Sequence, residues 1–172
     1  VTWELSRGYV YTARVRLVRD GGTVDVFPPF TFGFREIWRE GNQFMLNGHP
    51  CRFRMDWLNN KGVSVHSLPL YRMLGRFVFD RPPHGNGWWN PYTYTGETPA
   101  YDEELLDAMD RQGFGLLSQA PIVNPGGEEF PQTLLESPEA RAQYEREVRH
   151  YLRRYRNRPC ILAWMPAMLF GG

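Results

Sequence analysis

The stretch that decides the fold of this chain is Arg156-Asn157-Arg158-Pro159-Cys160-Ile161-Leu162-Ala163-Trp164. It predicts the end of a helix, a stop at the proline and then a buried strand, because proline cannot continue a helix and apolar residues follow it. Such a step is one βα unit of a barrel, and it places Trp164 at the carboxyl edge of the strand, where barrel enzymes keep their chemistry. The next five residues carry no carboxylate, since they are Met165-Pro166-Ala167-Met168-Leu169.

The residues before this stretch repeat the same alternation of strand and helix. The expected strands are 51–55, 77–79, 114–117 and 161–164, and the expected helices are 70–74, 102–112 and 138–155. Gly113 has the position of a helix C-cap, and Ser137-Pro138 has the pattern of a helix start. Short apolar strands separated by helices indicate parallel pairing with both sheet faces covered. We therefore predict an α/β fold in which residues 46–172 form the first four βα units of a (β/α)8 TIM barrel.

Residues 1–45 have the pattern of antiparallel strands instead. Residues 9–18 alternate apolar and polar side chains with period two, and residues 32–38 form a further expected strand. Asn47-Gly48 predicts a hairpin turn between two short apolar runs. We interpret residues 1–45 as the last strands of a β-sandwich that leads into the half barrel.

Composition excludes several classes of function. The 20 basic and 19 acidic residues leave a net charge of +1, which argues against a nucleic-acid partner. No apolar run approaches the ~20 residues that a membrane helix needs, so no membrane partner is expected. The four histidines lack the spacing of metal ligands, and no phosphate loop occurs, so we expect neither metal nor cofactor. Cys51 and Cys160 lie in apolar strand contexts and are interpreted as buried thiols. The compartment and the oligomeric state stay open.

Four segments of the chain carry a family likeness. In order they are Phe32-Gly33-Phe34-Arg35-Glu36-Ile37, Leu46-Asn47-Gly48-His49-Pro50, Tyr101-Asp102-Glu103-Glu104-Leu105-Leu106-Asp107 and Arg156-Asn157-Arg158-Pro159-Cys160-Ile161. Together they resemble glycoside hydrolase family two, the group of β-galactosidases, β-glucuronidases and β-mannosidases. The resemblance covers roughly residues 30–164, and it implies that the sandwich of residues 1–45 is immunoglobulin-like.

The resemblance also implies a reaction. Family members hydrolyse O-glycosidic bonds of β-linked glycosides with retention, using a glutamate acid/base after the fourth strand and a glutamate nucleophile after the seventh. Carried over from Trp164, the family's Asn-Glu pair falls on Met168-Leu169, which can neither donate a proton nor orient a sugar hydroxyl. The chain stops before a seventh strand, so we expect an inactive fragment of a parent that acts on carbohydrate. The alternative is a non-catalytic relative that binds carbohydrate through the aromatic loop 84–94.

Two aspartates are the candidates for polar chemistry. Asp56 and Asp80 each follow an apolar strand, and either carboxylate could accept hydrogen bonds from sugar hydroxyls. Asp80 is the tentative catalytic residue, a substitute acid whose pKa burial would raise. The other interpretation is a loop cap or an ion pair with Arg54 or Arg81. Arg81 and His84 retain, in altered register, residues of the segment that the family has after its second strand, so the resemblance implies substrate binding for them.

Aromatic and amide side chains complete the predicted substrate site. Trp57 and Trp164 end expected strands, where an aromatic ring can stack on a sugar or simply pack in the core. Trp88 belongs to the long loop, which forms either a stacking platform or a lid packed on itself. Gln119 ends the third strand and is either a donor to a sugar hydroxyl or a plain loop amide.

Overall fold

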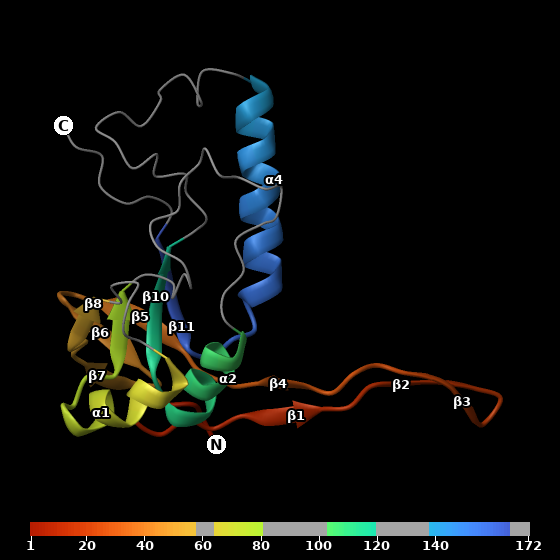
Figure 1. Cartoon of the computed structure of the whole chain (residues 1–172), viewed down its shortest axis with the longest axis horizontal. Helices are drawn as coiled ribbons and strands as arrows, with labels where there is room; N and C mark the ends of the chain where they lie inside the picture. Colours follow the sequence, from red (N-terminus) through yellow and green to blue (C-terminus); the bar gives the residue numbers. More distant parts are fainter. Residues whose placement is uncertain (58–63, 81–102, 120–137, 166–172) are drawn as a thin grey trace.

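Four parallel strands form the centre of the structure. This computed structural model describes residues 1–57, 64–80, 103–119 and 138–165 (Figure 1). The central sheet has the strand order β11-β10-β9-β8, with β8 (Met55–Trp57), β9 (Val78–Asp80), β10 (Gly115–Gln119) and β11 (Ile161–Met165). Every neighbouring pair in it is parallel. The sequence prediction that these four strands lie side by side and run in one direction is confirmed.

Helices occupy the connections between the parallel strands. They are the short 3-10 helix η1 (Val65–Ser67) and the α-helices α1 (Leu68–Met73), α2 (Glu103–Gln112) and α4 (Pro138–Tyr155). Gly113 follows α2 with a φ of +74°, a left-handed conformation that suits the predicted C-cap. Pro138 is the first residue of α4, as predicted, because its missing N–H has no partner in the first helical turn anyway.

The apolar core lies between the sheet and these helices. Phe79 of β9 stacks on Phe114, with ring centroids 5.7 Å apart, and Tyr71 of α1 meets Phe79 edge-on at 5.0 Å. The other fully buried apolar side chains near them include Leu68, Leu105, Leu106, Met109, Leu116 and Ile161. Burial of each such side chain stabilises the fold by roughly 1.5–3 kcal/mol, so this core is what holds helices and sheet together.

The first fifty residues form three small antiparallel sheets. β1 (Tyr11–Ala13) pairs with β4 (Phe30–Phe32), and β2 (Arg16–Arg19) pairs with β3 (Gly22–Val26) in the long arm on the right of Figure 1. β5 (Ile37–Glu40), β6 (Gln43–Leu46) and β7 (His49–Cys51) form the third sheet. The predicted hairpin turn is confirmed, since Asn47 and Gly48 between β6 and β7 have φ values of +51° and +85°.

Three predicted strands were wrong in extent, because each changes partner part-way. The run 9–18 divides into β1 and β2, which pair with different strands. The run 32–38 is interrupted between β4 and β5, where Arg35 leaves the ladder and contacts the start of β11. The run 51–55 divides into β7, which is antiparallel to β6, and β8, which enters the parallel sheet. The proposed boundary between residues 45 and 46 falls inside β6, so that division stays a prediction.

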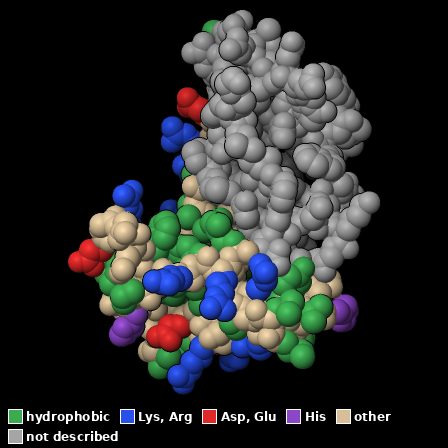
Figure 2. Space-filling model, turned by 90° about the vertical axis from the view of Figure 1, so that its left-hand side faces the viewer, with side chains coloured by type: hydrophobic (Ala, Val, Ile, Leu, Met, Phe, Trp, Pro, Cys, Tyr) green, Lys and Arg blue, Asp and Glu red, His purple; other side chains and the backbone are tan. Residues whose placement is uncertain are grey.

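The surface mixes apolar and basic side chains. Figure 2 shows hydrophobic side chains reaching the surface in several places, with Lys and Arg side chains between them. Within the described residues, no helix is both long and apolar enough to span a membrane. Cys160 is buried, as predicted, whereas Cys51 is only half-buried, and both are free thiols.

Candidate functional site

The carboxyl edge of the parallel sheet collects most of the predicted site residues that the structure describes. Trp57 at the end of β8 is in register with Asp80 at the end of β9, and Asp80 is in register with Leu117 of β10. Gln119, two residues further along β10, pairs with Met165 of β11. Because neighbouring strands lie about 4.8 Å apart and each residue rises about 3.3 Å, the backbones at Trp57 and Asp80 are about 5 Å apart, and Gln119 lies roughly 8 Å from Asp80 and roughly 12 Å from Trp57.

Trp164 contacts the helix layer in this structure. Its half-buried ring meets Tyr151 of α4 edge-on, with centroids 5.6 Å apart. The register partner of Trp164 is Ser118, and the Ser118 hydroxyl lies 3.2 Å from the Tyr151 hydroxyl. The sequence placed Tyr151 in the apolar stripe of its helix but gave no sign of this polar contact. A sugar-binding role for Trp164 stays a prediction.

Of the remaining predicted site residues, the structure gives only the strand position of Asp56. Asp56 lies in the middle of β8. Arg81, His84, Trp88 and the aromatic loop 84–94 lie outside the described residues, and so does Met168-Leu169. In the described parts of the chain, no group of three or more His, Cys, Asp or Glu side chains is arranged to hold a metal ion.

The amino end of the same sheet holds a network of charged side chains. Arg158, just before β11, donates hydrogen bonds to three carboxylates of α2, those of Glu103, Asp107 and Asp110, the last at 3.0 Å. Arg154 of α4 also binds Glu103, at 2.9 Å. The three acids follow one another at intervals of four and three residues, so they share one face of α2. The hydrogen bonds to Asp107 and Asp110 raise the pKa of Arg158, although burial acts in the opposite direction.

Asp110 is the buried member of this network. Its side chain is 1% exposed, and its Oδ1 accepts the backbone N–H of Cys160 at 2.8 Å. Burial raises the pKa of Asp110, although the hydrogen bonds from Cys160 and Arg158 favour the ionised form. The Asp110 carbonyl also accepts the indole N–H of Trp3, a fully buried residue, at 2.7 Å. Asp110 therefore joins the N-terminal segment, α2 and β11.

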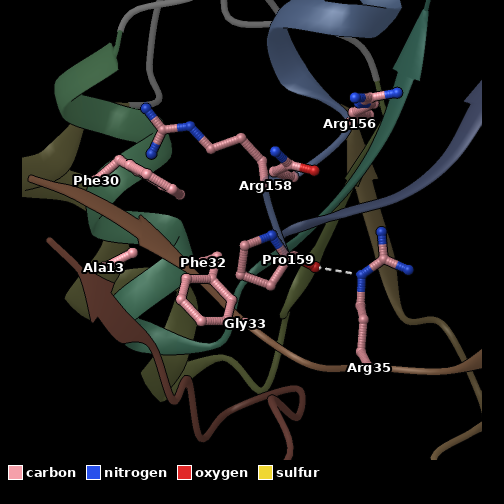
Figure 3. Close-up of a pocket in the computed structure, with 9 residues that line it drawn as sticks. Ala13, Phe30, Phe32, Gly33, Arg35, Arg156, Arg158 and Pro159 are labelled. Atoms are coloured by element: carbon pink, nitrogen blue, oxygen red, sulfur yellow. Dashed lines mark hydrogen bonds between the residues drawn. The ribbon is translucent and has the colours of Figure 1, made fainter. Parts of the chain in front are cut away.

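Arg35 approaches the start of β11 from the other side. Its Nε donates to the Pro159 carbonyl at 2.6 Å (Figure 3), and its Nη2 donates to the Ile161 carbonyl. Burial lowers the pKa of the Arg35 guanidinium. A pocket of about 550 Å³ lies beside this contact, lined among others by Phe30, Phe32 and Arg156. It is at the amino end of β11 and so is separate from the carboxyl edge.

Contacts around this amino end link the described parts of the four segments of the family likeness. Arg35 and Arg158 contribute the contacts just described. Asn47 accepts the backbone N–H of Glu36 at 2.9 Å and donates to the Trp3 carbonyl at 2.8 Å. Sequence analysis did not assign these roles, although the acid spacing of α2 opposite Arg158 could have suggested the network. These contacts join the N-terminal segment, α2 and the start of β11.

Comparison with known proteins finds sequence similarity to β-glucuronidases. No protein-family model matches the chain. A β-glucuronidase of Streptococcus agalactiae is 27% identical over 184 residues, which cover 96% of this chain and 28% of that protein. A β-glucuronidase of Paenibacillus borealis is 27% identical over 123 residues, covering 70% of this chain and 20% of the relative. The chain resembles the β-glucuronidases. The likeness to glycoside hydrolase family two that the four segments suggested is thus confirmed.

Solved β-glucuronidase structures share the fold. The enzyme from Ruminococcus gnavus in complex with D-glucuronic acid superposes with a TM-score of 0.65 at 18% identity, over 95% of this chain and 26% of that one. The enzyme from Bifidobacterium dentium, in complex with coumarin-3-O-glucuronide, gives 0.64 at 20% identity, over 95% and 25% of the two chains. This chain therefore spans about a quarter of the β-glucuronidase length.

Proposed function

We propose that this chain is part of a glycoside hydrolase that cleaves O-glycosidic bonds of β-linked glycosides. The observation that carries the proposal is the fold: the chain, with its four-stranded parallel sheet, superposes on a β-glucuronidase structure over 95% of its length. In this proposal residues 46–172 are the first half of a (β/α)8 barrel, and residues 1–45 are the last strands of an immunoglobulin-like sandwich. β6 then lies at the junction of the two domains.

The proposed substrates are β-glucuronides. Two of the solved neighbours hold glucuronic acid or a glucuronide, as described above. A glucuronide adds a carboxylate to an ordinary glycoside, so its site needs a cation, and arginine pairs well with carboxylates. Arg81 follows β9 directly in the sequence and is our candidate for this role, with His84 and Trp88 as further substrate contacts. Trp57, Asp56, Gln119 and Trp164 are proposed to bind sugar hydroxyls or ring faces at the same edge.

The reaction requires more than this chain supplies. Retaining hydrolysis uses one protonated carboxyl to assist the leaving oxygen and one carboxylate, about 5 Å away, to attack the anomeric carbon. Asp80 at the carboxyl edge is the proposed proton donor, because the position of the family's acid is taken by Leu169. A second carboxylate would come from the part of the barrel that this chain does not include. The 172-residue chain alone is thus expected to show no turnover.

The test is an assay of the longer protein that contains this chain. We expect it to release 4-nitrophenol from 4-nitrophenyl β-D-glucuronide faster than from the β-D-galactoside. Replacement of one general acid costs roughly 10²–10⁴-fold in rate, so Asp80→Asn should reduce kcat by that amount. The matched control is Asp20→Asn at an exposed turn, which should leave kcat unchanged. Full activity of Asp80→Asn would remove Asp80 from the mechanism.

A second candidate function is carbohydrate binding without hydrolysis. Met168-Leu169 at the family's acid/base position favours it. Titration calorimetry of the longer protein with glucuronic acid, beside the assay above, distinguishes the two functions. Binding with no turnover would establish the binding protein, and in that case Trp88→Ala should weaken binding, because a stacked ring commonly supplies much of the affinity for a sugar.

A further inference from the structure

Tyr151 lies at the contact between α4 and the parallel sheet. It belongs to the second half of the helix, and only 3% of the residue is exposed. A tyrosine hydroxyl needs a hydrogen-bond partner when it is buried. A phenylalanine would fill almost the same volume without that requirement. The hydroxyl at this position therefore has a consequence beyond apolar packing.

Ser118 of β10 contacts this hydroxyl. The two hydroxyl oxygens are 3.2 Å apart, and either group could donate the hydrogen. Ser118 is 0% exposed, so the contact lies in the interior of the described structure. A hydrogen bond constrains the distance and the direction between its two groups more narrowly than apolar contact does. The pair therefore fixes where β10 lies against α4.

Two aromatic contacts hold the Tyr151 ring. Trp164 of β11 meets it edge-on with ring centroids 5.6 Å apart, and Tyr155 meets it edge-on at 5.1 Å. Such edge-on pairs are a favoured arrangement of aromatic rings. Ser118 and Trp164 are also register partners in the sheet. One side chain of α4 thus contacts two neighbouring strands at the same level, β10 through its hydroxyl and β11 through its ring.

Gln119 follows Ser118 directly and is the last residue of β10. Successive residues of a strand belong to opposite faces of the sheet. Ser118 is on the face that α4 covers, because its hydroxyl contacts Tyr151. Position 119 therefore belongs to the other face, together with position 117, which pairs with Asp80 of β9. A shift of β10 relative to α4 would move Gln119 along with Ser118.

We propose that Tyr151 is a positioning residue for substrate binding: its hydroxyl, bonded to Ser118, sets the position of Gln119 at the carboxyl edge, where Gln119 contacts a hydroxyl of the sugar. The inference rests on the function proposed above, because it requires a sugar at that edge. Tyr151 itself does not touch the substrate and acts through β10. A residue that served the fold alone would change the unfolding free energy and leave the affinity for substrate unchanged.

The experiment uses the longer protein that contains this chain, with 4-nitrophenyl β-D-glucuronide as substrate. Tyr151→Phe keeps the ring and removes the hydroxyl, and Ser118→Ala removes the partner of that hydroxyl. Each should raise KM about three- to tenfold, the range of affinity that one neutral hydrogen bond supplies. The value of kcat should stay within about twofold, because a contact that is equal in the ground state and the transition state changes KM alone. If one variant does not fold, the other decides.

A double-mutant cycle tests whether Tyr151 acts through Gln119. Gln119→Ala should itself raise KM, because the proposed contact with the sugar is lost. In that background Tyr151→Phe should change KM by less than about 1.5-fold, since the group that it positions is already absent. The effects of Tyr151→Phe and Ser118→Ala should likewise not multiply, because both remove the same hydrogen bond.

Tyr155→Phe is the matched control. It makes the same exchange on the same helix, at a residue that is 1% exposed, and it keeps the ring that contacts Tyr151. Tyr155 lies one turn further along α4, where its carbonyl accepts the Arg158 N–H at 3.0 Å, at the amino end of the sheet. The KM of this variant should equal that of the parent, even if its midpoint of urea unfolding is lower.

Three outcomes would overturn the positioning role while leaving the proposed function in place. They are parental KM values in the folded Tyr151→Phe and Ser118→Ala variants, an undiminished effect of Tyr151→Phe in the Gln119→Ala background, and an equal rise of KM in Tyr155→Phe. If the parent binds D-glucuronic acid without turnover, dissociation constants from titration calorimetry replace KM in every comparison. A parent that neither binds nor cleaves these compounds would remove the proposed function, and this inference with it.

Discussion

Asp110 shows how one buried carboxylate can organise several segments. Its Oδ1 accepts the Cys160 N–H, its Oδ2 accepts from Arg158, and its carbonyl accepts from Trp3. The first of these contacts needs only an acceptor oxygen, whereas the second gains from a negative charge. An amide at this position would preserve an acceptor and remove the charge. The relative importance of acceptor and charge can therefore be measured at this single residue.

We predict that Asp110→Ala destabilises the chain by about 1–3 kcal/mol, because a buried N–H loses its acceptor. Asp110→Asn should cost clearly less, since its carbonyl oxygen can still accept from Cys160. Equilibrium urea unfolding followed by tryptophan fluorescence measures both values. The exposed variant Asp20→Ala should change the unfolding free energy by no more than roughly 0.5 kcal/mol. Equal losses in Asp110→Ala and Asp110→Asn would mean that charge, and not the acceptor, dominates.

The raised pKa of Asp110 also predicts a pH dependence. A carboxyl whose pKa is higher in the folded than in the unfolded state binds its proton more tightly when folded. Its contribution to stability is therefore fully present below the unfolded pKa and is lost as pH rises through the folded pKa. The unfolding free energy of the parent minus that of Asp110→Asn should fall as pH rises from about 4, the unperturbed value, and then level off. If this difference in unfolding free energy rises over the same pH range, the pKa of Asp110 is not raised in the folded state.

At the scale of elements, the sequence predicted local structure better than pairing. The four parallel strands and three helices follow from apolar runs, glycine and proline, all of which act within a few residues. The N-terminal strands were predicted too long, because a period-two pattern does not reveal where a strand changes partner. The contacts of Arg35 and Asp110 escaped prediction for a similar reason: they join residues 124 and 50 positions apart.

The end of α2 offers a test at this scale. A Cβ at Gly113 would lie 2.4 Å from the Arg7 nitrogen and 2.5 Å from the Glu4 carbonyl oxygen. Gly21 has a similar φ, +78° against +74°, but nothing within 4 Å of its would-be Cβ. Gly21→Ala should therefore lower the unfolding free energy by about 1–2 kcal/mol, because alanine disfavours the left-handed conformation. Gly113→Ala should lower it by more, because the added Cβ also clashes with the N-terminal segment.

The difference between the two glycine variants isolates the packing of the N-terminal segment on α2. Differential scanning calorimetry of both variants, together with the parent, provides the comparison. Similar melting temperatures for the two variants would show that the segment moves aside without cost.

At the scale of the whole molecule, the predicted site divides into a part that the structure places and a part that lies outside it. Apolar strands followed by polar or aromatic residues were enough to bring Trp57, Asp80 and Gln119 to one edge. The parallel order of the strands requires this, whatever the side chains are. Loop residues such as Arg81 and His84 have no such periodic constraint, so their arrangement does not follow from the pattern.

The contacts that link the described parts of the four likeness segments have a consequence for classifying relatives. Those residues hold the frame together, so a descendant that had abandoned hydrolysis would still need them in order to fold. Sequence searches that depend on these segments will group active enzymes with catalytically inactive relatives. Separating the two kinds requires a comparison of the residues that carry the chemistry, and the contacts of these segments do not report on them.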